Sequence, residues 1–286
     1  MINHLCVIGV GLIGGSLALA LKNAGYVKQV TGIGRSLENL QKAKQLGIID
    51  QYETDYAKAV SHADMVFVAV PVGVMSEVFK QIEPCLQKHT IVTDGGSAKT
   101  AVIEMATEGL GLKINQFIPG HPIAGTEKSG AEAAFDSLYA KRRVILTPLE
   151  ENSADDINAV RKMWQAAGAE VDEMGARHHD LVLAGTSHLP HVLAFALVDC
   201  LNKVDDVDEI FKYAAGGFRD FTRIASSDPV MWRDICLYNS DALLAMMQTY
   251  QNEIDALKTA IADSDSDALL KIFTDAKQAR DTFVCK

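Results

Sequence analysis

The stretch Gly9-Val10-Gly11-Leu12-Ile13-Gly14 decides how the first half of this chain folds. It follows an apolar run at residues 4–10, typical of a strand buried on both faces of a parallel sheet, and opens a helical pattern that ends before Gly25. In this strand–turn–helix setting, a G-x-G-x-x-G motif allows a tight turn, close approach to a pyrophosphate, and free N–H groups aimed at that anion. A glycine-rich turn that binds nothing is the alternative. The setting favours a dinucleotide site formed by Gly9, Gly11, Leu12, Ile13 and Gly14.

Strand and helix patterns then alternate through the first half of the chain. Short apolar runs predict strands at residues 29–34, 65–70, 90–94, 116–119 and 143–146. Helical spacing predicts helices at residues 13–24, 36–46 and 99–107. The alternation predicts right-handed βαβ crossovers, and therefore an α/β fold with a doubly wound, parallel, Rossmann-type sheet.

The second half of the chain has a different pattern. The composition becomes polar and acidic at residues 148–156, and strand signals nearly vanish after residues 169–172. Helical spacing then dominates, at residues 178–201, 207–214, 228–263 and 267–282. A length of 286 residues suits two domains. We predict a dinucleotide-binding domain at 1–150 and an all-helical domain at 151–286, with the boundary near Glu151.

Composition and charge exclude several classes of partner. The chain is 48% hydrophobic with a net charge of −10 and no Lys/Arg-rich stretch, which argues against binding to nucleic acid or anionic lipid. No apolar run approaches the roughly 20 residues that span a membrane, and residues 4–10 already form a strand where a signal peptide would lie. The five cysteines show no C-x-x-C pattern, which favours a reducing compartment: Cys6, Cys85, Cys200, Cys236 and Cys285. We expect a cytoplasmic protein.

The end of the second predicted strand bears on the choice of cofactor. NAD sites usually carry an acidic residue there, to hold the ribose 2′-hydroxyl. This chain has Gly34 at that point, followed by Arg35 and Ser36, whose charge and hydroxyl suit a 2′-phosphate. The pattern favours NADP over NAD, although Arg35 could instead lie over the adenine or in solvent. Val70 and Pro71, which end the strand at 65–70, are assigned to the same cofactor site.

Two further strand ends carry residues suited to chemistry. Ligands of doubly wound sheets bind beyond the carboxyl ends of the strands, so Ser97 lies where a substrate and a nicotinamide could meet. His121 stands between Gly120 and Pro122 after another strand. Its imidazole can take a proton near neutral pH, as the oxidation of an alcohol requires. Taken alone, the pattern also fits a loop histidine without a function.

With three segments of the second domain, the chain resembles the prephenate/arogenate (cyclohexadienyl) dehydrogenase family of tyrosine biosynthesis. Those segments are Ser187–His191, Gly216–Ala225 and Asp228–Asp234. The motifs G-x-G-x-x-G, D-x-x-S-x-K, G-H-P-x-x-G, S-H-L-P-H, G-G-F-x-D-x-T-R and D-P-x-M-W follow in that order along nearly the whole chain. The resemblance implies NAD(P)-dependent oxidative decarboxylation of prephenate, arogenate or both. It also implies a helical dimerisation domain and a homodimer. No appended regulatory domain is visible in the sequence, so we expect tyrosine, if it inhibits, to act at the active site.

The resemblance also implies roles for individual residues. His121 matches the family's base and Ser97 its hydrogen-bonding partner near the nicotinamide. Arg223 matches the arginine that binds a substrate carboxylate. The positions that line or gate the pocket are matched by Thr126, Glu127, Ser187, His191, Gly216 and Trp232. The chemistry needs a base and cations for two carboxylates, but no metal.

Several alternatives stay open at this point. A β-hydroxyacid dehydrogenase has the same layout but relies on a catalytic lysine, and a non-catalytic NADP-sensing regulator could keep the glycine loop. The neighbours His178 and His179 are interpreted as solvated capping residues, although with His188 and His191 they invite a zinc site. Pro190 either starts a helix or kinks a longer one, and Lys99 either contacts the cofactor or merely opens its helix. Trp232 is interpreted as a core residue first, and two arginines as surface or interface ion-pair partners, Arg219 and Arg233.

Overall fold

A computed structural model describes residues 1–205 and 207–283 of the chain. Its contacts divide the chain into two compact units, Met1–Ser240 and Asp241–Lys286. Four cysteines in the described part are free thiols, as expected, and Cys285 lies outside the described residues.

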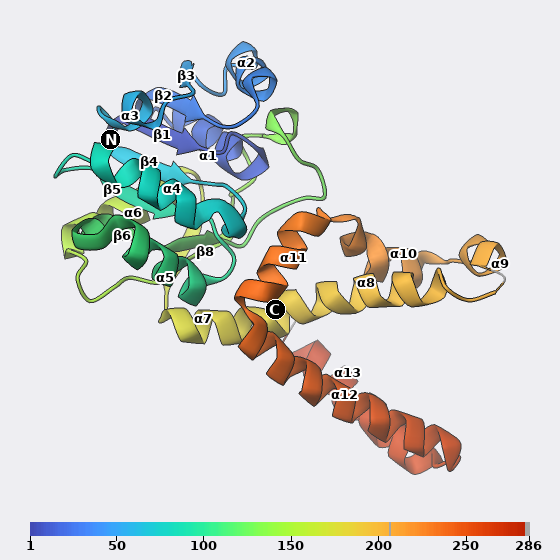
Figure 1. The fold of residues 1–286 in the computed structure, drawn as a ribbon. Coiled ribbons are helices and arrows are strands. Elements are labelled where there is room, and N and C mark those ends of the chain that lie inside the picture. The colour runs from blue at the N-terminus through green and yellow to red at the C-terminus, as the bar shows by residue number, and fades with distance from the viewer. Residues whose placement is uncertain (206, 284–286) are drawn as a thin grey trace. The chain divides into compact units, whose positions relative to one another are not determined.

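A six-stranded parallel sheet forms the core of the first unit (Figure 1). Its strands are β1 (Ile2–Ile8), β2 (Val27–Ile33), β3 (Gln51–Glu53), β4 (Met65–Val68), β5 (Ile91–Asp94) and β6 (Phe117–Ile118). They lie in the order β3-β2-β1-β4-β5-β6, and every neighbouring pair is parallel. The doubly wound prediction is therefore confirmed. The direction of winding reverses between β1 and β4, and ligands of such sheets bind in the crevice beyond the carboxyl ends at that point.

Helices cover both faces of this sheet. They are α1 (Leu12–Asn23), α2 (Leu37–Gln45), α3 (Tyr56–Val60), α4 (Met75–Ile82), α5 (Lys99–Leu110) and α6 (Ala154–Ala166). Alternate residues of β1 belong to two separate core clusters: Leu5 packs in the cluster that contains Trp164 of α6, and Cys6 in the cluster that contains Phe79 of α4. Because both faces are buried, the strands read as continuous apolar runs rather than as alternating ones.

A second, three-stranded sheet leads out of the first. It consists of β7 (Gly120–Pro122), β8 (Arg143–Leu146) and β9 (Glu170–Glu173), with β7 antiparallel and β9 parallel to β8. A parallel neighbour needs a crossover of a dozen or more residues. Since Pro119 alone separates β6 from β7, β7 cannot continue the parallel sheet. The strand predicted at 143–146 forms, but in this second sheet.

The segment after the predicted domain boundary packs on the core of the nucleotide-binding half. Val160, Met163 and Trp164 of α6 are buried in the same cluster as residues of β1. The boundary near Glu151 stays a prediction, while the contacts divide the chain after Ser240.

The rest of the chain is mainly helical. It contains α7 (Ala176–Leu183), α8 (Leu189–Leu201), α9 (Val207–Lys212), α10 (Gly216–Thr222), α11 (Pro229–Tyr238), α12 (Ser240–Ala262) and α13 (Ser266–Phe283). The shorter 3₁₀ helices are η1 (Val72–Val74), η2 (Glu83–Cys85), η3 (Gly111–Gln116), η4 (Ala131–Ala133) and η6 (Arg223–Ser226). The helix predicted at 228–263 is broken at Asn239, whose φ of −123° and ψ of 35° are not helical.

A π-helical turn joins α7 to α8. This turn, η5 (Ala184–His188), lies directly before Pro190, which is in the first turn of α8. Proline has no N–H for a bond to the preceding turn, so the helix widens there instead of ending. By length and composition, the continuous stretch Ala176–Leu201 could cross a membrane. The stretch carries two buried polar side chains, His179 and Asp180, and 28% of its most apolar part is buried.

Candidate active site

The glycine turn between β1 and α1 has the shape that a dinucleotide requires. Gly9 has a φ of +96°, and a Cβ there would lie 2.5 Å from the Ala69 carbonyl oxygen. A Cβ at Gly14 would lie 2.2 Å from the Gly9 oxygen. A Cβ at Gly11 would meet no atom within 4 Å. Gly9 and Gly14 therefore accept only glycine for reasons of packing, whereas Gly11 borders open space.

The N-terminus of α1 faces that space without a cap of its own. Gly11 is the N-cap residue and supplies no side chain, and the first turn, which begins with Leu12 and Ile13, has no acidic residue. The N–H groups of this turn are thus available to an anion. Val70 borders the same place, since its Cγ1 would lie 3.0 Å from a Cβ at Gly9. The residues present fit the diphosphate of a dinucleotide.

The end of β2 leaves Arg35 and Ser36 exposed. Ser36 caps α2, because its Oγ accepts a hydrogen bond of 3.2 Å from the N–H of Asn39. Its hydroxyl proton can still be donated to a ligand. A Cβ at Gly34 would meet Leu40 at 3.7 Å, an ordinary contact, so packing does not demand glycine there.

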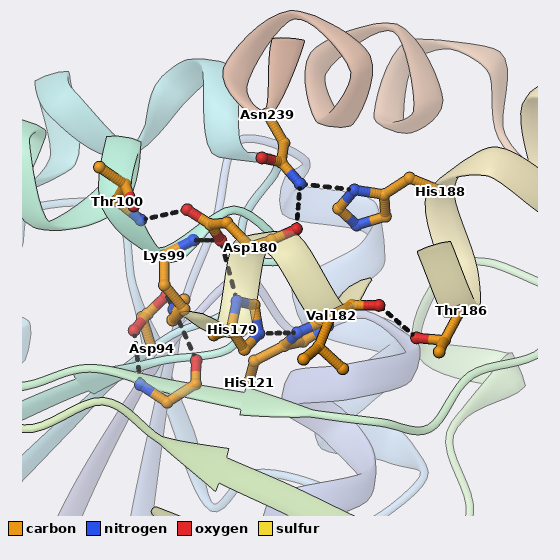
Figure 2. A network of polar contacts seen from close by, with 11 residues as sticks. Asp94, Lys99, Thr100, His121, His179, Asp180, Val182, Thr186, His188 and Asn239 are labelled. Carbon is orange, nitrogen blue, oxygen red and sulfur yellow. Dashed lines mark hydrogen bonds and ion pairs between the residues drawn. The ribbon is translucent and has the colours of Figure 1, made fainter. Parts of the chain in front are cut away.

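The predicted base lies in a pair of buried histidines (Figure 2). Nδ1 of His121, on β7, is 2.8 Å from Nε2 of His179, on α7, and both residues are buried. Burial lowers the pKa of His121 well below the usual 6.5, and His179, Lys99 and His188 lower it further. His121 is therefore a neutral imidazole at neutral pH. The interpretation of His179 as a solvated capping residue is wrong, because α7 turns this side chain inward, whereas His178 is exposed.

Asp180 binds the ring nitrogen of His179 that does not face His121. Its Oδ1 accepts a hydrogen bond of 2.9 Å from His179 Nδ1 and one of 2.8 Å from the N–H of Lys99. Its Oδ2 accepts one of 2.8 Å from the N–H of Thr100. Burial acts to raise the pKa of Asp180, but hydrogen bonds from His179, Thr100 and Lys99 outweigh burial and lower it. Asp180 is thus a carboxylate that also caps the N-terminus of α5.

Lys99 holds the strand that carries His121. Its Nζ, completely buried, donates hydrogen bonds of 2.6 Å to Asp94 Oδ2 and 2.7 Å to the Gly120 carbonyl oxygen. Asp94 Oδ1 accepts a further bond of 3.0 Å from the N–H of Gly120. The ion pair therefore fixes the backbone of Gly120 at both its N–H and its carbonyl. The sequence left the role of Lys99 open, and the structure assigns it to this clamp.

Other predicted pocket residues gather on the π turn, α8 and α11. The ring of His191 stacks on that of Trp232, with centroids 3.7 Å apart and planes at 18°. His191 Nδ1 lies 2.9 Å from the Ser187 carbonyl oxygen. Trp232 is buried and lines an apolar cavity of about 240 Å³. Asn239 Nδ2 donates 2.9 Å bonds to His188 Nδ1 and to the Asp180 carbonyl, which ties this group to the histidine pair (Figure 2).

Arg223 lies on the 3₁₀ helix η6, and its guanidinium forms an ion pair with Glu127. The Arg223 side chain is 64% exposed and that of Glu127 30%. The neighbouring Thr126 accepts a 3.3 Å hydrogen bond from the N–H of Lys128. Arg233 is paired with Asp234, in agreement with its interpretation as an ion-pair residue.

Some predicted residues are not brought into contact with the base. Within residues 1–205 and 207–283, no hydrogen bond or ion pair joins Ser97, Gly216 or Arg223 to His121. The side chain bonded to His121 is His179, which sequence reasoning assigned elsewhere. In the same described ranges, no group of three or more His, Cys, Asp or Glu side chains is placed to hold a metal ion.

A glycine turn at the switch point of a doubly wound sheet, followed by a buried imidazole and a helical domain, defines a two-domain, dinucleotide-dependent oxidoreductase. Two family profiles match the chain: prephenate dehydrogenase, nucleotide-binding domain, over residues 17–173, and prephenate dehydrogenase, dimerization domain, over residues 175–275. The chain belongs to the prephenate dehydrogenase family. It is an NAD(P)-dependent oxidoreductase with the prephenate/cyclohexadienyl dehydrogenase activity of tyrosine biosynthesis.

Similar proteins agree along the full length of the chain. A cyclohexadienyl dehydrogenase of Zymomonas mobilis is 39% identical over 97% of this chain and 94% of its own length. A prephenate dehydrogenase of Bacillus subtilis is 36% identical over 98% of this chain and 76% of its own. The crystal structure of prephenate dehydrogenase from A. aeolicus, in complex with hydroxyphenyl propionate and NAD+, superposes with a TM-score of 0.91 at 37% identity and covers 98% of each chain. The resemblance read from the motifs is confirmed, and the β-hydroxyacid and sensor alternatives are set aside.

Proposed function

We propose that the chain oxidises and decarboxylates prephenate to 4-hydroxyphenylpyruvate, with His121 as the base that takes the proton of the ring hydroxyl. The observation that carries this proposal is the neutral, buried imidazole of His121 on β7, held by His179 and by the clamped Gly120 backbone. A neutral imidazole is the form that can accept a proton.

The bonds that change are few. His121 takes the hydroxyl proton as hydride leaves the hydroxyl-bearing carbon and a ring C=O forms. The C–C bond to the ring carboxylate then breaks, carbon dioxide leaves, and the electron pair aromatises the ring to a phenolate, which takes back the proton held by His121 to become a phenol. When bound, the nicotinamide supplies the hydride acceptor. Ser97, after β5, is assigned the role of a hydrogen-bonding partner for the substrate hydroxyl and the base.

Arg223 is the proposed partner of a substrate carboxylate. Its planar fork suits two parallel hydrogen bonds to a carboxylate, and it already binds that of Glu127. Substrate therefore has to displace Glu127 from Arg223, which makes the ion pair a gate. The remaining walls of the pocket are assigned to Thr126, Ser187, His191, Gly216 and Trp232.

For the cofactor, we propose a preference for NADP over NAD. The support is Arg35, exposed beyond β2, with Ser36 beside it and no acidic side chain at Gly34. Gly9 to Gly14, Val70 and Pro71 would hold the rest of either dinucleotide. The relative from A. aeolicus was solved with NAD+, so this chain's preference has to be measured.

The assembly proposed is a homodimer that works in the cytoplasm. A dimerization-domain profile matches residues 175–275. Apolar side chains at helical spacing stay exposed along one face of α12, and a second copy could cover them: Met247, Tyr250, Ile254 and Ile261. Free thiols in the described part suit a reducing compartment.

The decisive assay follows the absorbance of the reduced nicotinamide with each of four pairs, prephenate or arogenate with NADP or NAD. We expect the largest kcat/KM with prephenate and NADP, and a smaller value with arogenate. The same assay with added tyrosine tests inhibition at the active site, which would show as a raised KM for prephenate. No reduction of either cofactor with either substrate would contradict the proposed function.

A further inference from the structure

We infer that His179 and Asp180 are positioning residues that set the tautomer of His121, so that its Nε2 carries the lone pair that receives the substrate proton. This inference rests on the proposed role of His121 as the base and adds two residues to it. It draws on the chain of hydrogen bonds that runs from α5 through α7 to β7 (Figure 2).

At the Asp180 end of this chain, the donor and the acceptor of each hydrogen bond are fixed. Asp180 accepts hydrogen bonds from the N–H groups of Lys99 and Thr100, and both groups can only donate. A carboxylate has no proton to give, so the 2.9 Å contact with His179 Nδ1 requires that this nitrogen carries the hydrogen. Burial lowers the pKa of His179 despite the hydrogen bond to Asp180, so the ring is neutral and its Nε2 has a lone pair.

The protonation state of His179 in turn decides which ring nitrogen of His121 carries the hydrogen. His179 Nε2, as an acceptor, lies 2.8 Å from His121 Nδ1, so His121 must donate from Nδ1. A neutral imidazole carries one proton, and the Nε2 of His121 is therefore left as an acceptor. No hydrogen bond joins this Nε2 to another residue in the described ranges. With the opposite tautomer, two lone pairs would face each other across 2.8 Å, and Nε2 could not take a proton.

The backbone next to His121 is held by buried side chains. Lys99 and Asp94 hold the carbonyl and the N–H of Gly120, one residue before His121, and both side chains are completely buried. When the substrate O–H breaks, the new N–H bond forms at Nε2 of His121, and the Nδ1–H bond remains directed at His179. The positive charge on His121 then faces the ring of His179, whose own N–H points to the Asp180 carboxylate.

The structure offers a matched pair of variants on one helix turn. His179→Gln removes the ring that receives the Nδ1–H, and His178→Gln changes an exposed neighbour as the control. We expect His179→Gln to lower kcat at least about tenfold with an almost unchanged KM for prephenate, because a base in the wrong tautomer fails at the chemical step. His178→Gln should match the wild type.

A double variant separates positioning from general structural support. If His179 acts through His121, adding His179→Gln to His121→Asn should cost no further activity. Equal fold losses in the two backgrounds would show a merely structural role and overturn the inference. A loss in His121→Asn with none in His179→Gln would also overturn it while leaving the base assignment intact. Near-wild-type activity in His121→Asn would instead contradict the proposed function.

The tautomer of His121 can also be observed directly in the wild-type enzyme. Histidine-selective ¹⁵N labelling of the wild-type enzyme with its oxidised cofactor gives separate shifts for protonated and unprotonated ring nitrogens. The His121 signals are assigned by their loss in His121→Asn. We expect hydrogen on Nδ1 of His121 and none on Nε2, and in Asp180→Asn a mixture of both forms. Hydrogen on Nε2 in the wild type, or an unchanged spectrum in Asp180→Asn, would overturn the inference.

Discussion

Nδ1 of His121 lies 2.8 Å from Nε2 of His179, and this contact joins the matched nucleotide-binding segment to the matched dimerization segment. The proposed base is therefore in contact with a residue from the other half of the chain. If His121 is the base, the pH dependence of the activity reports the environment of His121.

The pH dependence of activity should have its acidic limb below pH 6.5. Burial, followed by His179, Lys99 and His188, lowers the pKa of His121, so the imidazole stays neutral and active at pH 7. The ionisable groups that act on the His121–His179 pair are Asp94, Lys99, Asp180 and His188. A profile of kcat/KM against pH should be flat near neutrality and fall as the pH drops. A limb centred at or above pH 7 would contradict this environment.

The folded state should lose stability in acid through His188. Burial, followed by repulsion from His179, lowers the pKa of His188 from 6.5 to about 4. The unfolded chain takes up a proton below pH 6.5 while the folded chain does not, so stability is full above pH 6.5 and falls as the pH drops toward 4. The full loss, reached below pH 4, should be on the order of 3 kcal/mol, and about 2 kcal/mol of it should be present at pH 5. Urea unfolding at pH 7 and pH 5 measures this second, smaller loss, and His188→Gln should show a smaller difference between the two pH values than the wild type.

Arg223→Ala should raise the KM for prephenate strongly and leave cofactor affinity nearly unchanged. The reason is that Arg223 offers a bidentate fork to a dianionic substrate, and Arg223→Lys should rescue only partly because a point charge lacks that fork. Glu127→Gln is the matched variant, since it frees Arg223 from its ion pair and should not raise KM. Steady-state kinetics checks all three. If KM stays at the wild-type value in Arg223→Ala, the carboxylate site lies elsewhere, with Arg219 next to be tested.

Arg35→Ala should weaken NADP far more than NAD. The loss of a charge-assisted contact to the 2′-phosphate is worth about 1–3 kcal/mol, or roughly 5- to 150-fold in affinity. Arg35 is exposed, so the fold should be unaffected. Titration with both cofactors measures the two constants, and an equal loss for both would show that Arg35 does not read the 2′-phosphate.

Most of the fold could be predicted because its signals are local. The apolar run at residues 4–10 predicts a strand buried on both faces, and the positive φ of Gly9 and Gly25 explains the glycines at those turns. The placement of β8 could not be predicted. It depends on the single residue between β6 and β7, which forces the chain out of the parallel sheet.

The site was predictable to the extent that its residues stand in motifs. His121 and Lys99 lie within G-H-P-x-x-G and D-x-x-S-x-K, although the motif alone gave no role to Lys99. His179 and Asp180 were missed as functional residues, because adjacent polar residues at a helix start usually face solvent. The signal that could have found them is the carboxylate directly after a histidine, a pair suited to fixing an imidazole tautomer.

The turnover number of His121→Asn with saturating prephenate and cofactor tests the central claim most directly. Asparagine keeps some hydrogen bonding in a similar shape but cannot accept the proton, so kcat should fall by about 10²–10⁴-fold while the KM for prephenate stays near that of the wild type. A kcat within a few-fold of wild type would contradict the assignment of His121 as the base, and His191 would then be the next residue to test.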